Sequence, residues 1–201
     1  MNANVIARDW FARRPEEVAR DLIGQRLVRT WRGERMAGLI VETEAYLASD
    51  DAASHAARGK TRSNAAMFAQ PGTSYVYPIH AKFCFNVVTE ASGIGSAVLI
   101  RALEPVDGVK AMLRHRPISR TIDLTNGPAK LCQALRITRS LDHHDLTRGE
   151  QLWIEATDTV RWPIVITPRI GVTSAAHLPL RFVAAEHPWA SGSRRLNRHG
   201  D

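Results

Sequence analysis

The chain has 201 residues, of which 44% are hydrophobic, and this composition excludes a disordered protein. It contains no apolar run near the ~18 residues that a membrane span requires, and its N-terminus lacks the apolar core of a signal peptide. The two cysteines, Cys84 and Cys132, are too few for a disulfide scaffold or a zinc cluster. We therefore expect one domain over residues 1–201, located in the reducing cytoplasm and away from membranes.

The net charge of the chain is positive. Lys and Arg number 27 against 20 Asp and Glu, which gives a net charge of +7 and a pI near 10.1. Four of the basic residues are lysine and the other 23 are arginine, whose planar group matches phosphate oxygens and stacks on bases. This balance favours nucleic acid, an anionic membrane surface or an acidic protein as partner. Arginine spread over a solvated surface would give the same composition, so charge alone does not choose the partner.

Strand patterns outnumber helix patterns along the chain. A helix is predicted over residues 14–24, because Pro15 suits a first turn and Gly24 can end the helix. The polar termini, residues 1–13 and 191–201, are expected to be loose. The patterns further predict short helices that end near Arg116 and open at residues 126–128, and strands over residues 26–31, 38–46, 75–77, 83–88, 96–103, 151–155 and 162–168. This order predicts an α+β fold, a mostly antiparallel sheet with surrounding helices.

Two glutamates lie on one face of a predicted strand. Glu42, Glu44 and Tyr46 alternate along residues 38–46, and a rise of ~3.3 Å per residue places the two carboxylates about 7 Å apart. Each carboxylate would disfavour ionisation of the other, and such a pair can supply a general base near neutral pH. A solvated strand face, or carboxylates paired with arginines, would show the same spacing, so both interpretations stay open.

A β-hairpin with a basic tip is predicted next. Tyr75 and Tyr77 share one face of its first strand, and the connection places His80 and Lys82 near the tip. A tip with a planar side chain and a cation suits a nucleic-acid groove, although a plain hairpin with aromatic core residues fits the same pattern. On the second strand, a buried Asn86 amide needs a hydrogen-bond partner, which is either the backbone or a ligand.

The remaining histidines and the cysteines give no metal site. His143 and His144 are adjacent and therefore point in different directions, and no spaced Cys or Glu set accompanies them. We expect them to lie on a surface loop. Cys84 and Cys132 are expected to be small buried hydrophobic residues.

Eight blocks of the sequence stand in a fixed order. They are residues 40–46 (IVETEAY), 64–68 (NAAMF), 71–77 (PGTSYVY), 83–86 (FCFN), 98–105 (VLIRALEP), 124–131 (LTNGPAKL), 169–172 (RIGV) and 179–182 (PLRF). Together they resemble the alkyladenine (3-methyladenine or methylpurine) DNA glycosylase family, over about residues 15–185. The resemblance implies a curved antiparallel sheet with surrounding helices. It also implies a protruding β-hairpin that enters the DNA minor groove while a damaged nucleotide turns out into a pocket.

The resemblance implies a catalytic pair. Glu44 matches the general base that activates a water to attack the sugar C1′, and Arg101 matches the arginine that orients this water. The implied activity is base-excision repair of purines such as 3-methyladenine, 7-methylguanine, hypoxanthine and ethenoadenine. The expected product is an abasic site without strand cleavage, because no lysine nucleophile is apparent. We further expect a monomer that acts on duplex DNA without a metal or an organic cofactor, in the cytoplasm at the nucleoid.

The resemblance also implies a base-binding pocket. Tyr46 matches the aromatic wall on one face of the flipped base, and His55 and Tyr77 match the opposing wall. Stacking on such walls contributes about 1–3 kcal/mol per base. Asn86 matches the residue that disfavours the exocyclic amino group of guanine, at a cost on the order of 1–3 kcal/mol.

A set of further residues is expected to contact DNA. These are His80, Lys82, Arg58, Lys60, Arg62 and Met67. His80 stands where better-known members carry a wedge tyrosine, so we expect base flipping to be weaker or more sensitive to pH. Pro78 and a loop one residue shorter before Asn64 also depart from the family pattern.

Three other functions use the same residues. A carbohydrate glycosidase would employ Glu42 and Glu44 as its carboxylate pair, but the basic pI and the lack of an aromatic-rich sugar platform disfavour it. A non-catalytic DNA-binding module would keep the hairpin, and a basic structural protein would bind DNA without lesion preference. The presence of Glu44, Arg101 and Asn86 disfavours the non-catalytic module.

Overall fold

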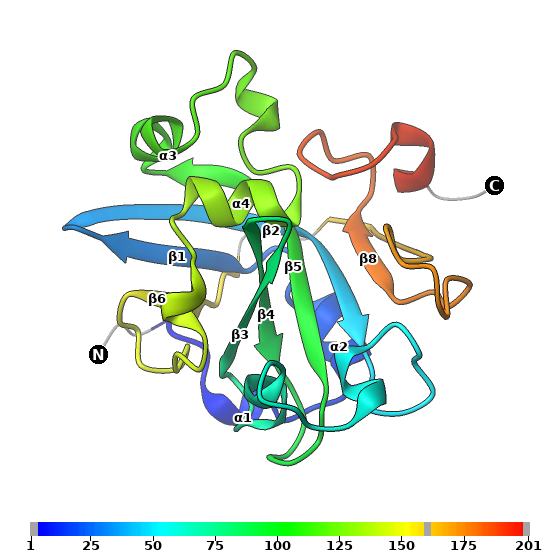
Figure 1. Cartoon of the computed structure of the whole chain (residues 1–201). Helices are drawn as coiled ribbons and strands as arrows, with labels where there is room; N and C mark the ends of the chain where they lie inside the picture. Colours follow the sequence, from blue (N-terminus) through cyan, green and yellow to red (C-terminus); the bar gives the residue numbers. More distant parts are fainter. Residues whose placement is uncertain (1–3, 159–161, 199–201) are drawn as a thin grey trace.

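The computed structural model describes residues 4–158 and 162–198, and within them eight strands form one antiparallel sheet (Figure 1). Neighbouring strands follow the order β3-β4-β5-β2-β1-β6, while β8 pairs with β2 and with β7. The strands are β1 (Arg26–Trp31), β2 (Glu34–Tyr46), β3 (Ser74–Ile79), β4 (Lys82–Val88), β5 (Ala97–Asp107), β6 (Leu152–Glu155), β7 (Ile164–Thr167) and β8 (Arg181–Ala184). The helices are α1 (Arg8–Phe11), α2 (Pro15–Asp21), α3 (Val109–His115) and α4 (Pro128–Ala134), with short 3-10 turns η1 (His55–Arg58), η2 (Ala65–Phe68), η3 (Thr121–Asp123), η4 (Arg139–Leu141) and η5 (Arg194–Asn197).

The predicted elements lie close to the observed ones. β1 has the predicted bounds, whereas β2 begins at Glu34, four residues before the predicted strand. Residues 55–58, for which no helix or strand was predicted, form the turn η1. β8 was not predicted, and all four of its residues are buried.

Strand β2 bends where its carboxylates lie. One edge of β2 pairs with β1 along residues 34–39 and with β8 along residues 42–44, and the other edge pairs with β5. The pairing with β5 shifts register between Ile40 and Glu42 and again before Thr43. Such bulges bend a strand and increase its twist. The predicted α+β fold with a curved antiparallel sheet is therefore confirmed.

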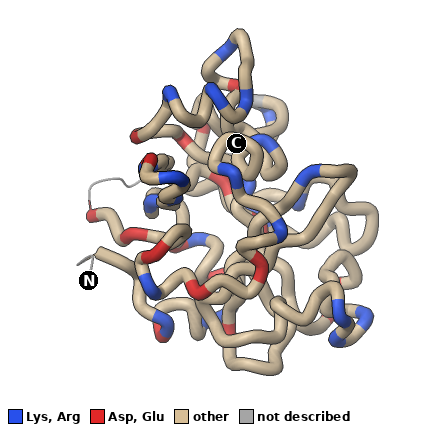
Figure 2. The backbone as a smooth tube through the Cα atoms, turned by 60° about the vertical axis from the view of Figure 1, so that its left-hand side comes forward, with Lys and Arg blue, Asp and Glu red and all other residues tan. Residues whose placement is uncertain are grey.

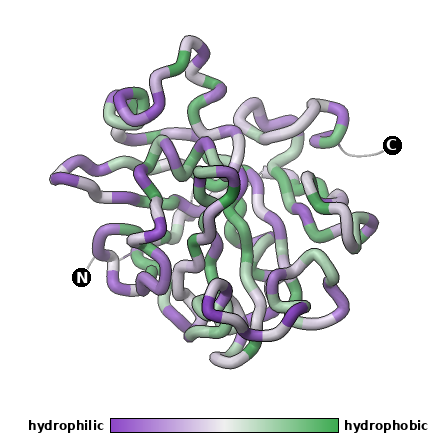
Figure 3. The backbone as a smooth tube through the Cα atoms, viewed as in Figure 1, coloured by the Kyte–Doolittle hydropathy of each residue, from purple (hydrophilic) through white to green (hydrophobic). Residues whose placement is uncertain are grey.

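Apolar residues fill the centre of the fold, while hydrophilic segments lie at its periphery (Figure 3). Helix α2 packs against β2 and β5, and α4 packs against β4 and β5. Helix α2 begins at Pro15, whose missing N–H is not needed at a helix start, and Val18 and Leu22 are fully buried in the main core. A second core cluster comprises Ala56, Ala66, Met67, Tyr75, Val88 and Ala97, with Tyr46, Phe68 and Tyr77 packed against it.

The expectation of loose termini is wrong for the described parts of both ends. Near the N-terminus, Phe11 is fully buried and Ile6 is 5% exposed, and Val5 forms a β-bridge with Glu155. Near the C-terminus, Ser191 and Asn197 are buried because they hydrogen-bond to charged groups inside the protein. The expectation for residues 1–3 and 199–201 lies outside the described residues.

The basic side chains are spread over the surface. Figure 2 shows Lys and Arg on several sides of the molecule, interspersed with Asp and Glu. The charge pattern alone therefore does not mark a binding face. Among the helices that the structure describes, none is long and apolar enough to cross a membrane.

Candidate active site

Strand register brings four predicted segments into one row. Glu44 on β2 pairs with Leu99 on β5, Leu99 also pairs with Asn86 on β4, and Asn86 pairs with Tyr75 on β3. Directly opposed residues of antiparallel strands project from the same face of a sheet. Residues up to 55 positions apart in the chain thus share one face, with Glu44 at one end of the row and Tyr75 at the other.

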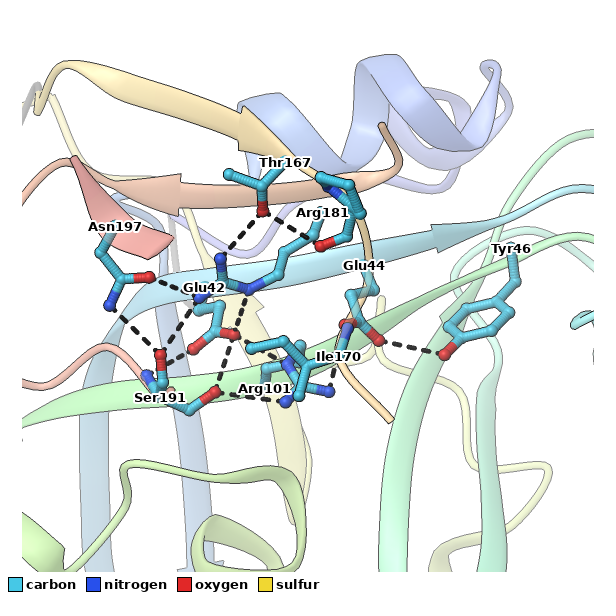
Figure 4. Close-up of polar contacts among 10 residues, drawn as sticks. Glu42, Glu44, Tyr46, Arg101, Thr167, Ile170, Arg181, Ser191 and Asn197 are labelled. Atoms are coloured by element: carbon cyan, nitrogen blue, oxygen red, sulfur yellow. Dashed lines mark hydrogen bonds and ion pairs between the residues drawn. The ribbon is translucent and has the colours of Figure 1, made fainter. Parts of the chain in front are cut away.

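Glu44 is fully buried, two groups donate hydrogen bonds to its carboxylate, and Arg101 forms an ion pair with it (Figure 4). The Tyr46 hydroxyl donates to Oε2 at 3.0 Å, and the backbone N–H of Ile170 donates to Oε1 at 2.8 Å. Nη1 of Arg101 lies 3.2 Å from Oε1. A carboxylate offers about four acceptor positions, and these contacts use three of them. The Ile170 contact has no signal in the sequence, because the donor is a backbone group.

Glu42 has a different role from Glu44. Its Oε1 accepts from Arg101 Nε at 2.8 Å, Arg181 Nε at 2.7 Å and Ser191 Oγ at 2.8 Å, and its Oε2 accepts from the Ser191 N–H at 2.6 Å. Burial acts to raise the pKa of Glu42, but Arg101 and Arg181 outweigh burial and hold this pKa below its ordinary value. Of the interpretations left open for this pair of carboxylates, the structure therefore shows pairing with arginines for Glu42.

Arg101 bridges the two glutamates. It is 7% exposed and contacts Glu42 through Nε and Glu44 through Nη1. Burial acts to lower the pKa of Arg101, but Glu44 and Glu42 outweigh this effect and raise it. Its guanidinium therefore stays charged beside Glu44.

The predicted aromatic residues come together on β3 and η1. The ring centroids of His55 and Tyr77 are 4.6 Å apart, those of Tyr75 and Tyr77 are 5.5 Å apart, and Nδ1 of His55 lies 2.7 Å from the Tyr75 hydroxyl. Tyr46 packs against the same cluster. Burial raises the pKa of all three tyrosines, which keeps their hydroxyls protonated. Burial and then Arg58 lower the pKa of His55, so its ring is neutral at pH 7.

The Asn86 side chain is held by the backbone. Asn86 is 3% exposed, and its Nδ2 donates to the Tyr75 carbonyl oxygen at 3.0 Å. Of the two partners considered for this amide, the structure therefore shows the backbone one. The bond fixes the plane of the amide next to the aromatic cluster.

Arg169 lies over the ring of Tyr46, and the sequence pattern did not predict this contact. Its guanidinium carbon lies 4.6 Å from the centroid of the Tyr46 ring, and it donates to both carboxylate oxygens of Asp51 at 2.6 and 2.7 Å. Both side chains of this ion pair are fully buried. Burial acts to raise the pKa of Asp51, but Arg169 outweighs burial and lowers it. Arg169 falls in one of the matching sequence blocks, and only its spatial neighbours reveal the role.

We expect Arg169→Lys to weaken folding. Lysine keeps the charge but loses the planar fork that binds Asp51 and stacks on Tyr46, so the free energy of unfolding should fall by about 1–2 kcal/mol. Urea unfolding measures this effect. The exposed Arg148→Lys is the control, and equal free energies of unfolding for the two variants would contradict the role of Arg169.

The predicted hairpin has a strained two-residue turn. β3 and β4 pair as far as Ile79 and Lys82, which leaves His80 and Ala81 as the turn, with φ of 44° and 60°. Two successive positive φ values characterise the type I′ hairpin, whose twist matches that of the strands. The side chains from Pro78 to Lys82 are exposed.

The other residues predicted to contact DNA divide into two groups. Arg58, Lys60 and Arg62 are exposed on the segment between β2 and β3. Met67 is 2% exposed and packs in the second core cluster. The expected DNA contact of Met67 is therefore wrong, because η2 turns this apolar side chain inward.

The described residues contain no group of three or more His, Cys, Asp or Glu side chains that could hold a metal ion. Nε2 of His144 lies within hydrogen-bonding distance of the carbonyl oxygens of Glu150 and Leu152. Cys84 and Cys132 are buried free thiols, as predicted.

Comparisons with known proteins assign the class. A family model described as Methylpurine-DNA glycosylase (MPG) matches residues 9–188. A protein of Rhodopirellula baltica named "Putative 3-methyladenine DNA glycosylase" is 49% identical over 195 residues, which are 94% of this chain and 84% of that protein. Identically named proteins of Methanocella arvoryzae and Carboxydothermus hydrogenoformans are 45% and 44% identical, over 92% and 93% of this chain and 90% and 98% of their own lengths.

These comparisons show that the protein is a DNA glycosylase, a hydrolase of N-glycosyl bonds. Within this class, the chain belongs to the methylpurine-DNA glycosylase family.

Proposed function

We propose that this glycosylase releases alkylated and deaminated purines from duplex DNA with a water molecule activated by Glu44. The observation that carries the proposal is the arrangement around this carboxylate. Ile170, Arg101 and Tyr46 fix both oxygens and use three of about four acceptor positions, so a further donor would find its acceptor on Oε2. A water that donates to this position would be held next to the aromatic cluster.

The damaged nucleotide has to leave the base stack before this chemistry is possible. C1′ of a stacked nucleotide is poorly accessible, so the damaged nucleotide would be extruded into a pocket between Tyr46 on one side and His55 and Tyr77 on the other. A neutral His55 ring suits stacking on a purine. The exposed tip of the β3–β4 hairpin would enter the minor groove, with His80 filling the gap in the base stack.

In the proposed reaction, Glu44 accepts a proton from the water as the water oxygen bonds to C1′. The bond between C1′ and the purine nitrogen breaks, and its electron pair leaves with the base. A cationic lesion such as 3-methyladenine leaves as a neutral molecule, whereas hypoxanthine or ethenoadenine needs a proton or strong contacts in the pocket. Arg101, charged and in contact with Glu44, would orient the water.

The proposed enzyme is monofunctional and leaves an abasic site. A lyase would need an amine close to C1′, but Lys60, Lys82 and Lys110 are exposed and Lys130 donates to Asn126. Reduction with borohydride during turnover should therefore trap no covalent protein–DNA adduct. We further propose that the enzyme acts as a monomer on nucleoid DNA in the cytoplasm, with Arg58, Lys60, Arg62 and Lys82 on backbone phosphates.

The test measures base release from two substrates. One is methylated DNA, from which free methylpurines are counted, and the other is a duplex oligonucleotide with a single hypoxanthine or ethenoadenine, in which abasic sites are cleaved by alkali. Release from both substrates supports the full proposal, and release from methylated DNA alone restricts it to cationic lesions. Binding of the lesion without release of any base would identify a non-catalytic binding module instead.

We expect His80→Ala to lower the excision rate on duplex DNA about tenfold, because alanine cannot fill the space of an extruded nucleotide and the stack contributes about 1–3 kcal/mol per base. Excision from single-stranded DNA, where no stack has to be opened, should change far less. The comparison of the two rates measures the wedge role. Ala81→Gly, which relieves the positive φ beside His80, is the control, and an unchanged duplex rate in His80→Ala would exclude the wedge.

A further inference from the structure

The guanidinium of Arg101 is held at all three nitrogens. Nε donates to Glu42 at 2.8 Å, Nη1 lies 3.2 Å from Glu44, and Nη2 donates to the hydroxyl oxygen of Ser191 at 3.2 Å (Figure 4). Two of the three anchors lie on β2, the strand of the proposed base. The third comes from the C-terminal segment, which lies 90 residues further along the chain.

Ser191 is the centre of this contact. Its hydroxyl donates to Glu42 Oε1 while it accepts from Arg101, and its backbone N–H donates to Glu42 Oε2. Its carbonyl oxygen accepts from Arg181 Nη2 at 3.1 Å and from Asn197 Nδ2 at 3.2 Å. Every polar group of Ser191 is therefore used, and the residue is 8% exposed.

Asn197 connects the C-terminal segment, residues 191–198, to the sheet through hydrogen bonds. It is 4% exposed, and its Oδ1 accepts from Arg181 Nη2 at 2.7 Å, while Nδ2 holds the Ser191 carbonyl oxygen. Arg181 in turn is fully buried and donates to Glu42 through Nε. The turn η5 thus closes a loop of hydrogen bonds from Glu42 through Arg181 and back to Ser191.

The charges of the cluster balance only when both arginines are present. Glu42 and Glu44 carry two negative charges, and Arg101 and Arg181 carry two positive ones. Arg181 neutralises Glu42, so the charge of Arg101 remains directed at Glu44. Ser191 fixes the rotation of the Arg101 plane, because it holds Nη2 on the side away from Glu44.

We propose that Ser191 and Asn197 are positioning residues of the glycosylase site, which hold Arg101 so that its Nη1 faces Glu44. Both lie beyond residues 9–188, the part that the family model matches. This inference rests on the proposed function of Glu44 and Arg101. Within the described residues, the side chains of Ser191 and Asn197 form hydrogen bonds only inside this cluster, so their loss should slow the chemical step and spare DNA binding.

The test is a comparison of single-turnover excision rates and lesion-DNA affinities. Ser191→Ala should lower the rate about ten- to hundredfold, because small misplacements of catalytic groups have effects of this size, while the affinity changes less than about threefold. Ser191→Thr, which keeps the hydroxyl, should recover most of the rate. Asn197→Ala removes the hydrogen bond that holds the Ser191 carbonyl oxygen, and it should lower the excision rate about tenfold. The exposed Ser193→Ala in the same segment is the matched control, with an unchanged rate.

The outcomes separate this inference from the function on which it rests. Wild-type protein that excises bases while Ser191→Ala and Asn197→Ala excise them equally fast overturns the positioning role alone. Equal losses in Ser191→Ala and Ser191→Thr, with parallel losses in affinity and melting temperature, also overturn it, because that pattern belongs to a structural role. Wild-type protein that releases no base from any lesion contradicts the proposed function and this inference with it.

Discussion

Glu44→Gln should abolish measurable base excision while the protein still binds lesion DNA. General-base catalysis contributes roughly 10²- to 10⁴-fold to a rate, and the amide of glutamine cannot accept the proton of the attacking water. The expected loss in the single-turnover rate is of this size. It should appear with methylated DNA and with the hypoxanthine oligonucleotide alike, because both reactions use the same water.

The structure explains why glutamine fits at this position. Its Oε1 can accept from the Ile170 N–H and from Arg101, as the carboxylate does, and its Nε2 can donate to the Tyr46 hydroxyl oxygen, which then rotates its own proton away. The substitution keeps these contacts but leaves the buried cluster with a net positive charge, so the free energy of unfolding should also fall by several kcal/mol, and excision is measured at a temperature at which the variant is folded. Glu186→Gln, on a side chain that is 69% exposed, serves as the control. A Glu44→Gln protein with wild-type rates would remove Glu44 from the reaction.

Strand alternation predicted which side chains share one face of the sheet better than it predicted the residues that pair with them. Glu44, Tyr46 and the aromatic residues of β3 occupy positions that a period of two assigns to one face, and the register then aligns them across four strands. The sequence pattern did not predict the partners of Glu42, because Arg101 and Arg181 lie 59 and 139 residues away along the chain. Whether two carboxylates repel each other or bind arginines depends on such distant pairing.

The burial of the C-terminal segment also depends on residues that lie far away in the sequence. Its polar composition suggested a loose tail, since polar residues at a chain end are commonly solvated. Ser191 and Asn197 are instead buried, because the ionic groups beneath them offer hydrogen bonds that water would otherwise supply. A local pattern does not reveal that a buried charge cluster lies nearby. The backbone donor of Ile170 is hidden for a related reason, as any residue with an N–H could serve.

Glu42→Gln should lower the free energy of unfolding by about 3–5 kcal/mol, the usual effect of removing one partner from a buried ion pair. The substitution leaves Arg101 and Arg181 facing one remaining carboxylate, so the buried cluster gains a net positive charge. Chemical denaturation at pH 7 measures the loss. Glu186→Gln, which breaks an exposed pair with Arg198, should cost less than about 1 kcal/mol.

The charge argument predicts a partial rescue in the double variant. Arg181→Met alone leaves the buried cluster with a net negative charge and should also destabilise the protein by several kcal/mol. Glu42→Gln with Arg181→Met restores the balance between Arg101 and Glu44, so the double variant should lose less stability than the two single losses added together. Strictly additive losses would show that the two side chains act independently, contrary to their 2.7 Å contact.

The pH dependence of stability provides an independent test of the same pair. The folded protein holds the pKa of Glu42 below its ordinary value, which is 4.5 for the unfolded chain. The stabilisation from Glu42 is therefore fully present above about pH 4.5 and is lost as the pH falls toward the folded pKa. Wild-type protein should lose stability more steeply than Glu42→Gln below this pH, and the two curves should run parallel between pH 6 and 8. Curves that stay parallel down to pH 3 would mean that Glu42 does not carry the charge on which the cluster depends.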